Sequence, residues 1–426
     1  MLRKIIETIG TRYLVAFLNL ILLVLNARAL GIHGVGLIGL VLAAVNIVMM
    51  CNSVLSGNTI VYFMNRYPSF QVFIPAYLWT ISMGALASCI MWVSGLIPEG
   101  YGIHVYLLSL LLSLTAANAR FLLGTDCIRK FNLTYTLQGG LLFVAVLILY
   151  YVFDVKTVDA YICGLYIANG TAWIISLLWV MPLLKRGTWN ELPSLTWNMF
   201  LYGLWAGVDN LAEQFTSRIN YFLLQRFSGV GSVGLFDAGT KVSESVWNIS
   251  RSISFIVFGK VAQTEDANIQ KRITIQLVWL TLLATTIVML FVLLIPEFVF
   301  TSWLFGQEFS GIRKVIICLT PGVIALACNS IFSHFFIGSG RVRISTISSL
   351  LGLSVLLLTG SLLIPVSGVP GAALSGSAAY LSMLSFSIIQ FCRITSTRVG
   401  ELLPDKTDIT SICRRIRNLG SRSGQS

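Results

Sequence analysis

Apolar runs long enough to cross a lipid bilayer recur along the whole chain, and they constrain its fold more than any other feature. About 20 residues at a rise of 1.5 Å span a hydrocarbon core of about 30 Å. The runs lie at 13–30, 36–56, 73–96, 103–122, 133–153, 159–183, 199–224, 233–257, 275–296, 313–336, 345–365 and 371–394. With 56% apolar and 11% charged residues, the sequence predicts an all-α, polytopic membrane protein with twelve transmembrane helices.

The basic residues in the connections predict the orientation of these helices. An even number of crossings places both termini on one side, and loops rich in Lys and Arg stay in the cytoplasm. With the N-terminus inside, the cytoplasmic segments hold most of the basic residues, and the outer segments hold five: Arg28, Lys156, Arg226, Arg313 and Lys314. We therefore expect both termini inside. The net charge of +12 follows mostly from this topology, so a nucleic-acid partner is not required, although the basic tail favours contact with anionic membrane lipids.

Two parts of the sequence repeat each other six helices apart. At an offset of 198, Arg28, Gly31, Val35, Gly36 and Leu37 correspond to Arg226, Gly229, Val233, Gly234 and Leu235. At an offset of 214, Phe121, Gly124, Thr125, Ile128 and Arg129 correspond to Phe335, Gly338, Ser339, Val342 and Arg343. Such similarity is typical of transporters built from two parallel bundles related by an axis along the membrane normal. We predict six-helix bundles at 1–184 and 199–394, a cytoplasmic linker at 185–198 and a basic cytoplasmic tail at 395–426.

The seventh and eighth helices, within Phe200 to Phe258, carry an unusual number of charges. These are Asp209, Glu213, Arg218, Asp237, Lys241, Glu244 and Arg251. From Asp237 to Arg251, the polar residues Asp237, Lys241, Glu244, Asn248 and Arg251 are spaced by 4, 3, 4 and 3 and share one side of a helix. Each charge costs about 2.5 to 3.5 kcal/mol near a helix centre, so this side must face protein or water. A polar path across the membrane is predicted; an internal ladder of ion pairs, starting with Asp237 and Lys241, is the structural alternative.

The first helix also has a polar side, and together these helices predict a cationic chamber. Its polar residues are Arg12, Asn19 and Asn26, seven residues apart, with Arg28 at its outer end. Dispersed cations suit a phosphate or pyrophosphate group, which accepts hydrogen bonds from several Arg or Lys donors. The candidate substrate-binding residues are Arg12, Asn19, Asn26, Arg28, Arg218, Lys241, Asn248 and Arg251. The acids Asp209, Glu213, Asp237 and Glu244 are candidates for coupling to protons or sodium, or for salt bridges with the bases.

Motifs for enzymatic or metal chemistry are missing from the sequence. It has no G-x-x-x-x-G-K-[ST] for ATP hydrolysis, no D-x-D for a metal-bound nucleotide sugar and no G-x-S-x-G nucleophile. The three histidines, His33, His104 and His334, lie far apart, and the eight cysteines form no C-x-x-C pair. We predict a protein that is not an enzyme and has no cofactor or metal.

These features resemble one transporter family. The twelve crossings, Arg28-Ala29-Leu30-Gly31 with Gly34-Val35-Gly36, and the run from Gly234 to Lys241 with Glu244 are similar to the polysaccharide (O-antigen, Wzx-type) flippases. That family belongs to the multidrug/oligosaccharidyl-lipid/polysaccharide exporter superfamily. The resemblance covers nearly the whole chain as architecture, and its motifs are diffuse.

The resemblance implies that undecaprenyl-pyrophosphate-linked oligosaccharide is moved to the periplasmic leaflet of a bacterial inner membrane, for O-antigen or capsule assembly. Arg28, Lys241 and Arg251 would contact the head group, with Asp237 and Glu244 setting their charge state. Polysaccharide polymerase and chain-length proteins are the partners it implies. A cation-coupled multidrug exporter of the same superfamily is the first alternative, and a membrane glycan polymerase or ligase is the second.

Overall fold

The protein is entirely helical in the residues that the computed structural model describes, which are 2–64, 66–185, 192–263 and 266–397. At 2–9, 12, 58, 205–211, 213, 247–263 and 267 the description covers the backbone and not the side chains. The helices are α1 (Leu2–Ser56), α2 (Asn58–Met64), α3 (Ser69–Val93), α4 (Gly102–Gly124), α5 (Ile128–Leu147), α6 (Val158–Val180), α7 (Leu192–Ser228), α8 (Val230–Gln263), α9 (Ala267–Leu294), α10 (Ile312–Gly338), α11 (Val342–Ser367) and α12 (Val369–Ile394). Short π and 3₁₀ segments are η1 (Ile148–Val152), η2 (Met181–Leu183), η4 (Val299–Leu304) and η5 (Gln307–Phe309).

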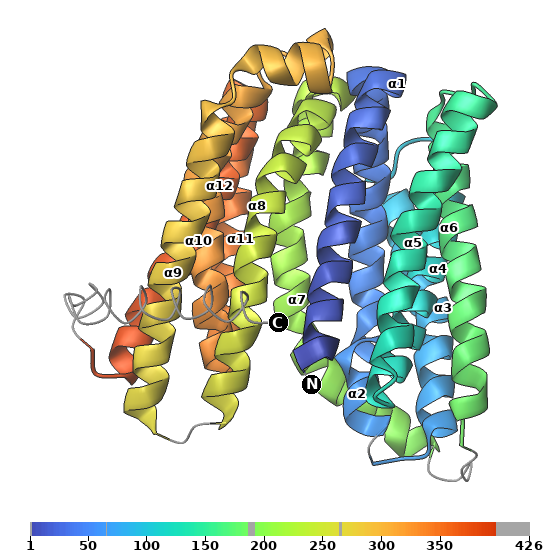
Figure 1. Cartoon of the computed structure of the whole chain (residues 1–426), viewed down its shortest axis with the longest axis vertical. Helices are drawn as coiled ribbons and strands as arrows, with labels where there is room; N and C mark the ends of the chain where they lie inside the picture. Colours follow the sequence, from blue (N-terminus) through green and yellow to red (C-terminus); the bar gives the residue numbers. More distant parts are fainter. Residues whose placement is uncertain (1, 65, 186–191, 264–265, 398–426) are drawn as a thin grey trace, which may run out of the picture. The chain divides into compact units, whose positions relative to one another are not determined.

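The helices are long and apolar enough to confirm a polytopic membrane protein. Nine candidate spans occur in the described residues. The first, Tyr13–Met64, has 52 residues and breaks at Gly31, whose φ is 68°; there the chain reverses, so α1 supplies two crossings (Figure 1). The charged helices α7 and α8 have 37 and 34 residues, which at 1.5 Å per residue also exceed about 30 Å. With these, a helix occupies each of the twelve predicted crossings.

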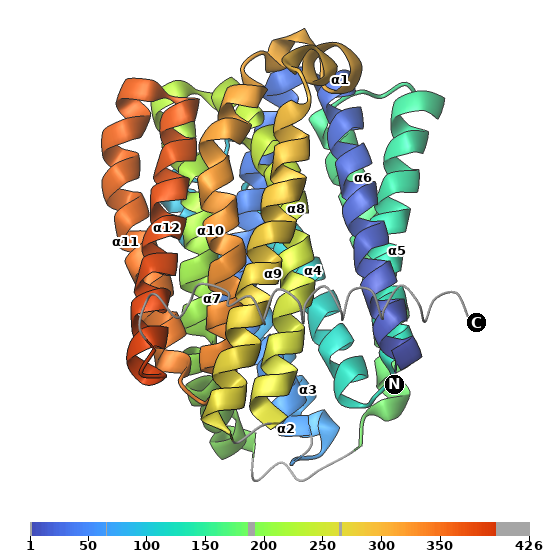
Figure 2. The ribbon, with the colours of Figure 1, turned by 60° about the vertical axis from the view of Figure 1, so that its left-hand side comes forward.

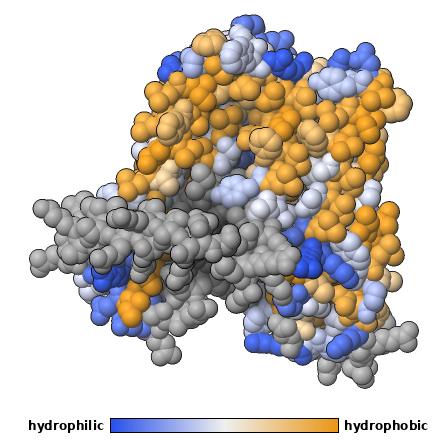
Figure 3. Space-filling view, viewed as in Figure 1, coloured by the Kyte–Doolittle hydropathy of each residue, from blue (hydrophilic) through white to orange (hydrophobic). Residues whose placement is uncertain are grey.

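The surface of the helices fits a lipid environment. Many large apolar side chains are exposed, among them Val366 at 84% and Leu294 at 75%. On the face shown in Figure 3, apolar side chains cover much of the length of the helices, and hydrophilic ones gather toward their ends. In a bilayer, acyl chains would cover this apolar surface.

The chain forms two compact units. The first comprises 1–241, 296–315 and 360–372, and the second comprises 242–295, 316–359 and 373–426. This grouping follows contacts between helices and is not a division at the linker, so the predicted bundles at 1–184 and 199–394 remain a prediction.

Each unit has a core of its own. The core of the first unit includes Leu55, Phe121 and Phe131. In the second unit, Phe335 packs against Phe391 with ring centroids 5.0 Å apart, and α9 to α12 run alongside one another (Figure 2).

Both units contain the same buried polar contact. In the first, Asn118 Nδ2 on α4 donates to Ser176 Oγ on α6 at 3.0 Å. In the second, Ser387 Oγ on α12 donates to Asn329 Oδ1 on α10 at 2.7 Å. Each bond spans 58 residues of sequence, and both partners shift by 211 residues. The sequence match between α4 and α10 has an offset of 214. The offset of the polar contacts, 211, differs from it by three residues, or about one helical turn.

The two sequence segments that match at an offset of 198 contact each other inside the first unit. A Cβ on Gly36 would lie 2.1 Å from the carbonyl oxygen of Val230, and a Cβ on Gly234 would lie 2.0 Å from that of Ile32. Gly36 corresponds to Gly234, and Ile32 corresponds to Val230. Each contact is thus the image of the other, as a two-fold axis requires. Glycine is needed because the second half of α1 touches α8 backbone to backbone.

Candidate functional site

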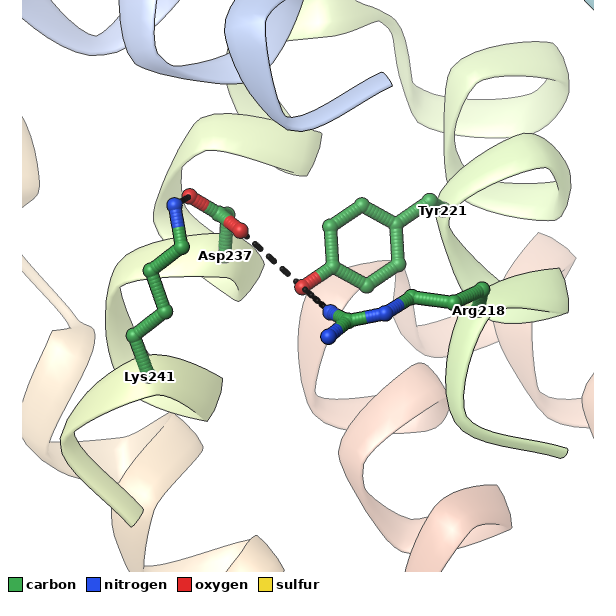
Figure 4. Close-up of polar contacts among 4 residues, drawn as sticks. All are labelled: Arg218, Tyr221, Asp237 and Lys241. Atoms are coloured by element: carbon green, nitrogen blue, oxygen red, sulfur yellow. Dashed lines mark hydrogen bonds and ion pairs between the residues drawn. The ribbon is translucent and has the colours of Figure 1, made fainter. Parts of the chain in front are cut away.

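The charged side chains of α7 and α8 come together because one residue separates the two helices. Gly229 has a φ of 82°, a left-handed conformation that glycine adopts without strain. It lets the chain turn back at once, so that the end of α7 lies beside the start of α8. Arg218 and Tyr221 on α7 then face Asp237 and Lys241 on α8 (Figure 4).

These four side chains form one hydrogen-bonded network. Lys241 Nζ is 2.7 Å from Asp237 Oδ2, and the hydroxyl of Tyr221 donates to Asp237 Oδ1 at 3.0 Å. Arg218 Nη1 donates to the same hydroxyl at 3.0 Å. Tyr221 and Asp237 are buried, so the carboxylate is held from two sides by donors, as a buried charge requires.

The four side chains drawn in Figure 4 comprise two cations, one carboxylate and one neutral hydroxyl. Arg218 and Lys241 face a single carboxylate, which leaves a formal charge of +1 among the four groups in Figure 4. The side chain of Lys241 is 32% exposed, against 2% for Asp237. The Lys241 side chain therefore has accessible surface, whereas that of Asp237 has almost none.

The structure contains the first pair of the predicted ion ladder, between Asp237 and Lys241, but the network goes further than that ladder. It continues through Tyr221 to Arg218 on a second helix. Glu244, half-buried one turn beyond Lys241, has an interaction of its own. The second half of α1 makes room for the acid, since a Cβ on Gly39 would lie 3.3 Å from Asp237 Cγ.

Tyr221 is the member of the site that sequence reasoning missed. Its position three residues after Arg218 is the signal that was available, because residues three apart are neighbours on a helix. Arg218 lies five residues after Glu213, which places the two on different sides of the helix. Arg218 is directed toward Tyr221, whose ring centroid is 5.4 Å from its guanidinium carbon.

The first helix places its predicted site residues at different points. Asn26 is buried and its Oδ1 accepts a hydrogen bond from the hydroxyl of Tyr150 at 3.0 Å, whereas Asn19 is exposed. Arg28 donates from Nε to the carbonyl oxygen of Leu304 at 3.0 Å. The structure thus ties Asn26 and Arg28 to other partners, and their roles in substrate binding remain predictions.

The remaining predicted residues have side chains outside the described part of the structure. They are Arg12, Asp209, Glu213, Asn248 and Arg251. Within the described part, no three His, Cys, Asp or Glu side chains gather as metal ligands would, and the seven described cysteines are free.

Comparison with known proteins identifies the fold. No protein-family model matches the sequence, and no curated protein matches it. A solved multidrug resistance MATE family transporter of the MOP superfamily, in its inward-facing conformation, is similar with a TM-score of 0.69 and 11% identity over 92% of this chain and 94% of that one. The Lipid II flippase MurJ in an inward closed conformation is similar with a TM-score of 0.67 and 13% identity, over 95% and 89% of the two chains. The MATE multidrug transporter DinF-BH gives a TM-score of 0.65 and 15% identity, over 91% and 94%.

Identities this low establish the fold alone. The chain has the all-α fold shared by MATE transporters and MurJ, as predicted. The superfamily resemblance is thereby confirmed as a fold, and the Wzx-type family within it belongs to the proposal below.

Proposed function

We propose that the protein is a flippase that moves undecaprenyl-pyrophosphate-linked oligosaccharide from the cytoplasmic to the periplasmic leaflet by alternating access. The observation that carries the proposal is the network of Arg218, Tyr221, Asp237 and Lys241, in which Lys241 pairs with a buried carboxylate and Arg218 is joined to it through the Tyr221 hydroxyl. A membrane-embedded protein retains such charges at a cost of several kcal/mol, which favours a functional role. The fold shared with the Lipid II flippase MurJ supports a lipid-linked cargo.

The network suggests how an anionic head group is received. Without cargo, Asp237 compensates Lys241, and the ion pair avoids an isolated charge in the membrane. A pyrophosphate group brings oxygen acceptors and negative charge, so it takes Lys241 as a donor in exchange for Asp237. The hydroxyl of Tyr221 keeps its bond to the carboxylate during this exchange, and Arg218 adds a second positive charge behind it.

Asp237 is also our candidate for ion coupling. Protonation of its carboxylate removes the charge opposite Lys241, which frees the ammonium for the cargo. Loss of that proton would restore the ion pair, so protonation of Asp237 and binding of cargo at Lys241 would be linked. We place the protein in a bacterial inner membrane with both termini in the cytoplasm, as the basic connections predict.

A cation-coupled multidrug exporter is the second candidate function. It is favoured by the similarity to the MATE multidrug transporter DinF-BH. The partly exposed Lys241 side chain in the network argues against it, because an ammonium group suits an anionic ligand better than a lipophilic cation. Drug susceptibility of a deletion strain separates the two candidates.

The test uses a strain whose surface glycan depends on this gene. We expect Lys241→Ala to abolish surface glycan when strains are compared at equal amounts of membrane-inserted protein, and Lys241→Arg to retain part of it because the charge is kept. Lys156→Ala is the matched control, since Lys156 also lies 2.7 Å from an acid, Asp154, but outside the candidate spans. Full surface glycan in the Lys241→Ala strain would refute the binding role.

A further inference from the structure

The break in α1 is held by the segment that connects α9 to α10. At Gly31 the φ of 68° interrupts the helix and leaves the N–H of Ile32 without its usual helical partner. Glu308, from the η5 segment of that connection, accepts this N–H at 2.8 Å. A Cβ on residue 31 would lie 2.6 Å from Glu308 Oε2. Glycine is therefore favoured at position 31 by its backbone conformation, and any larger residue there would also displace the Glu308 carboxylate.

Arg28 binds the same connection from the other side of the break. Its guanidinium donates to the carbonyl oxygens of Ser302, at 3.3 Å, Trp303 and Leu304, at 3.0 Å. These carbonyls belong to the last turn of η4, where they have no partner within the helix and attract a cation. We call the four parts together the clasp: Arg28, the N–H of Ile32, the carbonyls of 302–304 and Glu308.

The clasp occurs at one of the two repeats. Arg226 and Gly229 correspond to Arg28 and Gly31, and Gly229 has the same left-handed φ. The connection at the matching place, 94–101 between α3 and α4, lacks the η4 and η5 segments found at 296–311. In the part of the chain that the structure describes, no hydrogen bond or ion pair joins Arg226 to that shorter connection. The contacts of Arg28 with the longer connection therefore have no counterpart among the described residues of the other repeat.

The clasp lies within about one helical turn of a close backbone contact between α1 and α8. Ile32, which donates to Glu308, also supplies the carbonyl oxygen that touches Gly234. Gly36 makes the reciprocal contact with Val230. At this end of the two helices the backbones touch, and no space is left between them for a cargo.

We propose that the clasp keeps this end of the transporter closed and must release before the end opens. This inference rests on the alternating access of the proposed function. Three features suit a reversible latch: its bonds are exposed to solvent, they involve charged groups, and they lie outside the apolar cores. Water can replace such bonds one by one, whereas a buried ion pair leaves an uncompensated charge when it breaks.

The test measures opening directly, with a cysteine placed beside the helix contact. Val35 is 2% exposed and adjacent to Gly36, so Val35→Cys should react slowly with a charged maleimide in nanodiscs, followed at that peptide by mass spectrometry. We expect Arg28→Ala and Glu308→Ala each to speed labelling about tenfold, the change that follows from losing a charge-assisted hydrogen bond. Glu308→Gln keeps an acceptor oxygen and should stay close to the parent. Arg226→Ala, the counterpart in the repeat, is the matched control and should leave the rate within about twofold.

Hydrogen exchange at Ile32 in the same samples shows whether the clasp has released. Faster exchange with unchanged labelling in both alanine variants would overturn the proposal, because the clasp would then only anchor a connection. Equal acceleration by Arg226→Ala would also overturn it. The labelling needs no cargo, so a failure of the flippase assay with accelerated labelling would count against the proposed cargo and not against the clasp.

Discussion

Asp237→Asn tests the energetics of the intramembrane network most directly. Asparagine keeps an acceptor for the Tyr221 hydroxyl and removes the negative charge opposite Lys241. At the observed 2.7 Å, the Coulomb energy of the pair is about 6 kcal/mol for an effective dielectric constant of 20, before desolvation is subtracted. Breaking a buried pair costs about 3–5 kcal/mol, and exposed pairs contribute about 0.2–1 kcal/mol. Because Asp237 is 2% and Lys241 32% exposed, we expect a coupling energy of about 2 kcal/mol, between these limits.

A double-mutant cycle with Lys241→Met measures this coupling. Lys241→Met should destabilise the protein more than Asp237→Asn, since it leaves the more deeply buried charge without its partner. The double variant should recover about 2 kcal/mol relative to the sum of the single changes. Unfolding of the purified protein in detergent supplies the free energies, and transport should be lost in the double variant although its stability is restored.

A second pair in the chain provides the control for this cycle. Lys156 and Asp154 are also 2.7 Å apart, but their side chains are 44% and 79% exposed. Their coupling should be much smaller, because water screens exposed pairs. If the coupling of Asp237 with Lys241 were no larger than that of this surface pair, the reasoning from burial would be refuted.

Three further outcomes follow from the structure. Gly36→Ala should lower the unfolding temperature and abolish transport because its Cβ has no space, whereas Gly140→Ala, with no atom within 4 Å of the new Cβ, should do neither. Asn329→Ala should destabilise the protein by about 1–3 kcal/mol in an unfolding titration, because it leaves the buried hydroxyl of Ser387 without this acceptor. Hydrogen bonding to Lys156 lowers the pKa of Asp154. The pair should therefore stabilise the protein above the ordinary pKa of Asp, and this stabilisation should be lost as the pH falls through the lowered pKa. Measurements of stability against pH should show that Lys156→Ala removes this dependence.

Helix crossings were predictable because the bilayer imposes a length and a polarity on each of them. The break at Gly31 was predictable only as a loop between two crossings. In the structure one residue with a positive φ separates the two helices, since a contact with Glu308 from a distant connection replaces the hydrogen bond lost there. No local pattern identifies that partner, because it lies 276 residues away.

The amino-acid sequence by itself determined an all-helical membrane protein, its repeat and the concentration of charge on α7 and α8, because hydrophobic length and helical period are properties of the chain taken in order. Tertiary structure alone decided which charges meet. Tyr221 joins Arg218 to Asp237, and Arg28 is engaged by carbonyl groups. Periodicity specifies the face of a helix on which a side chain lies, but its partner depends on the rotation and depth at which the neighbouring helix packs.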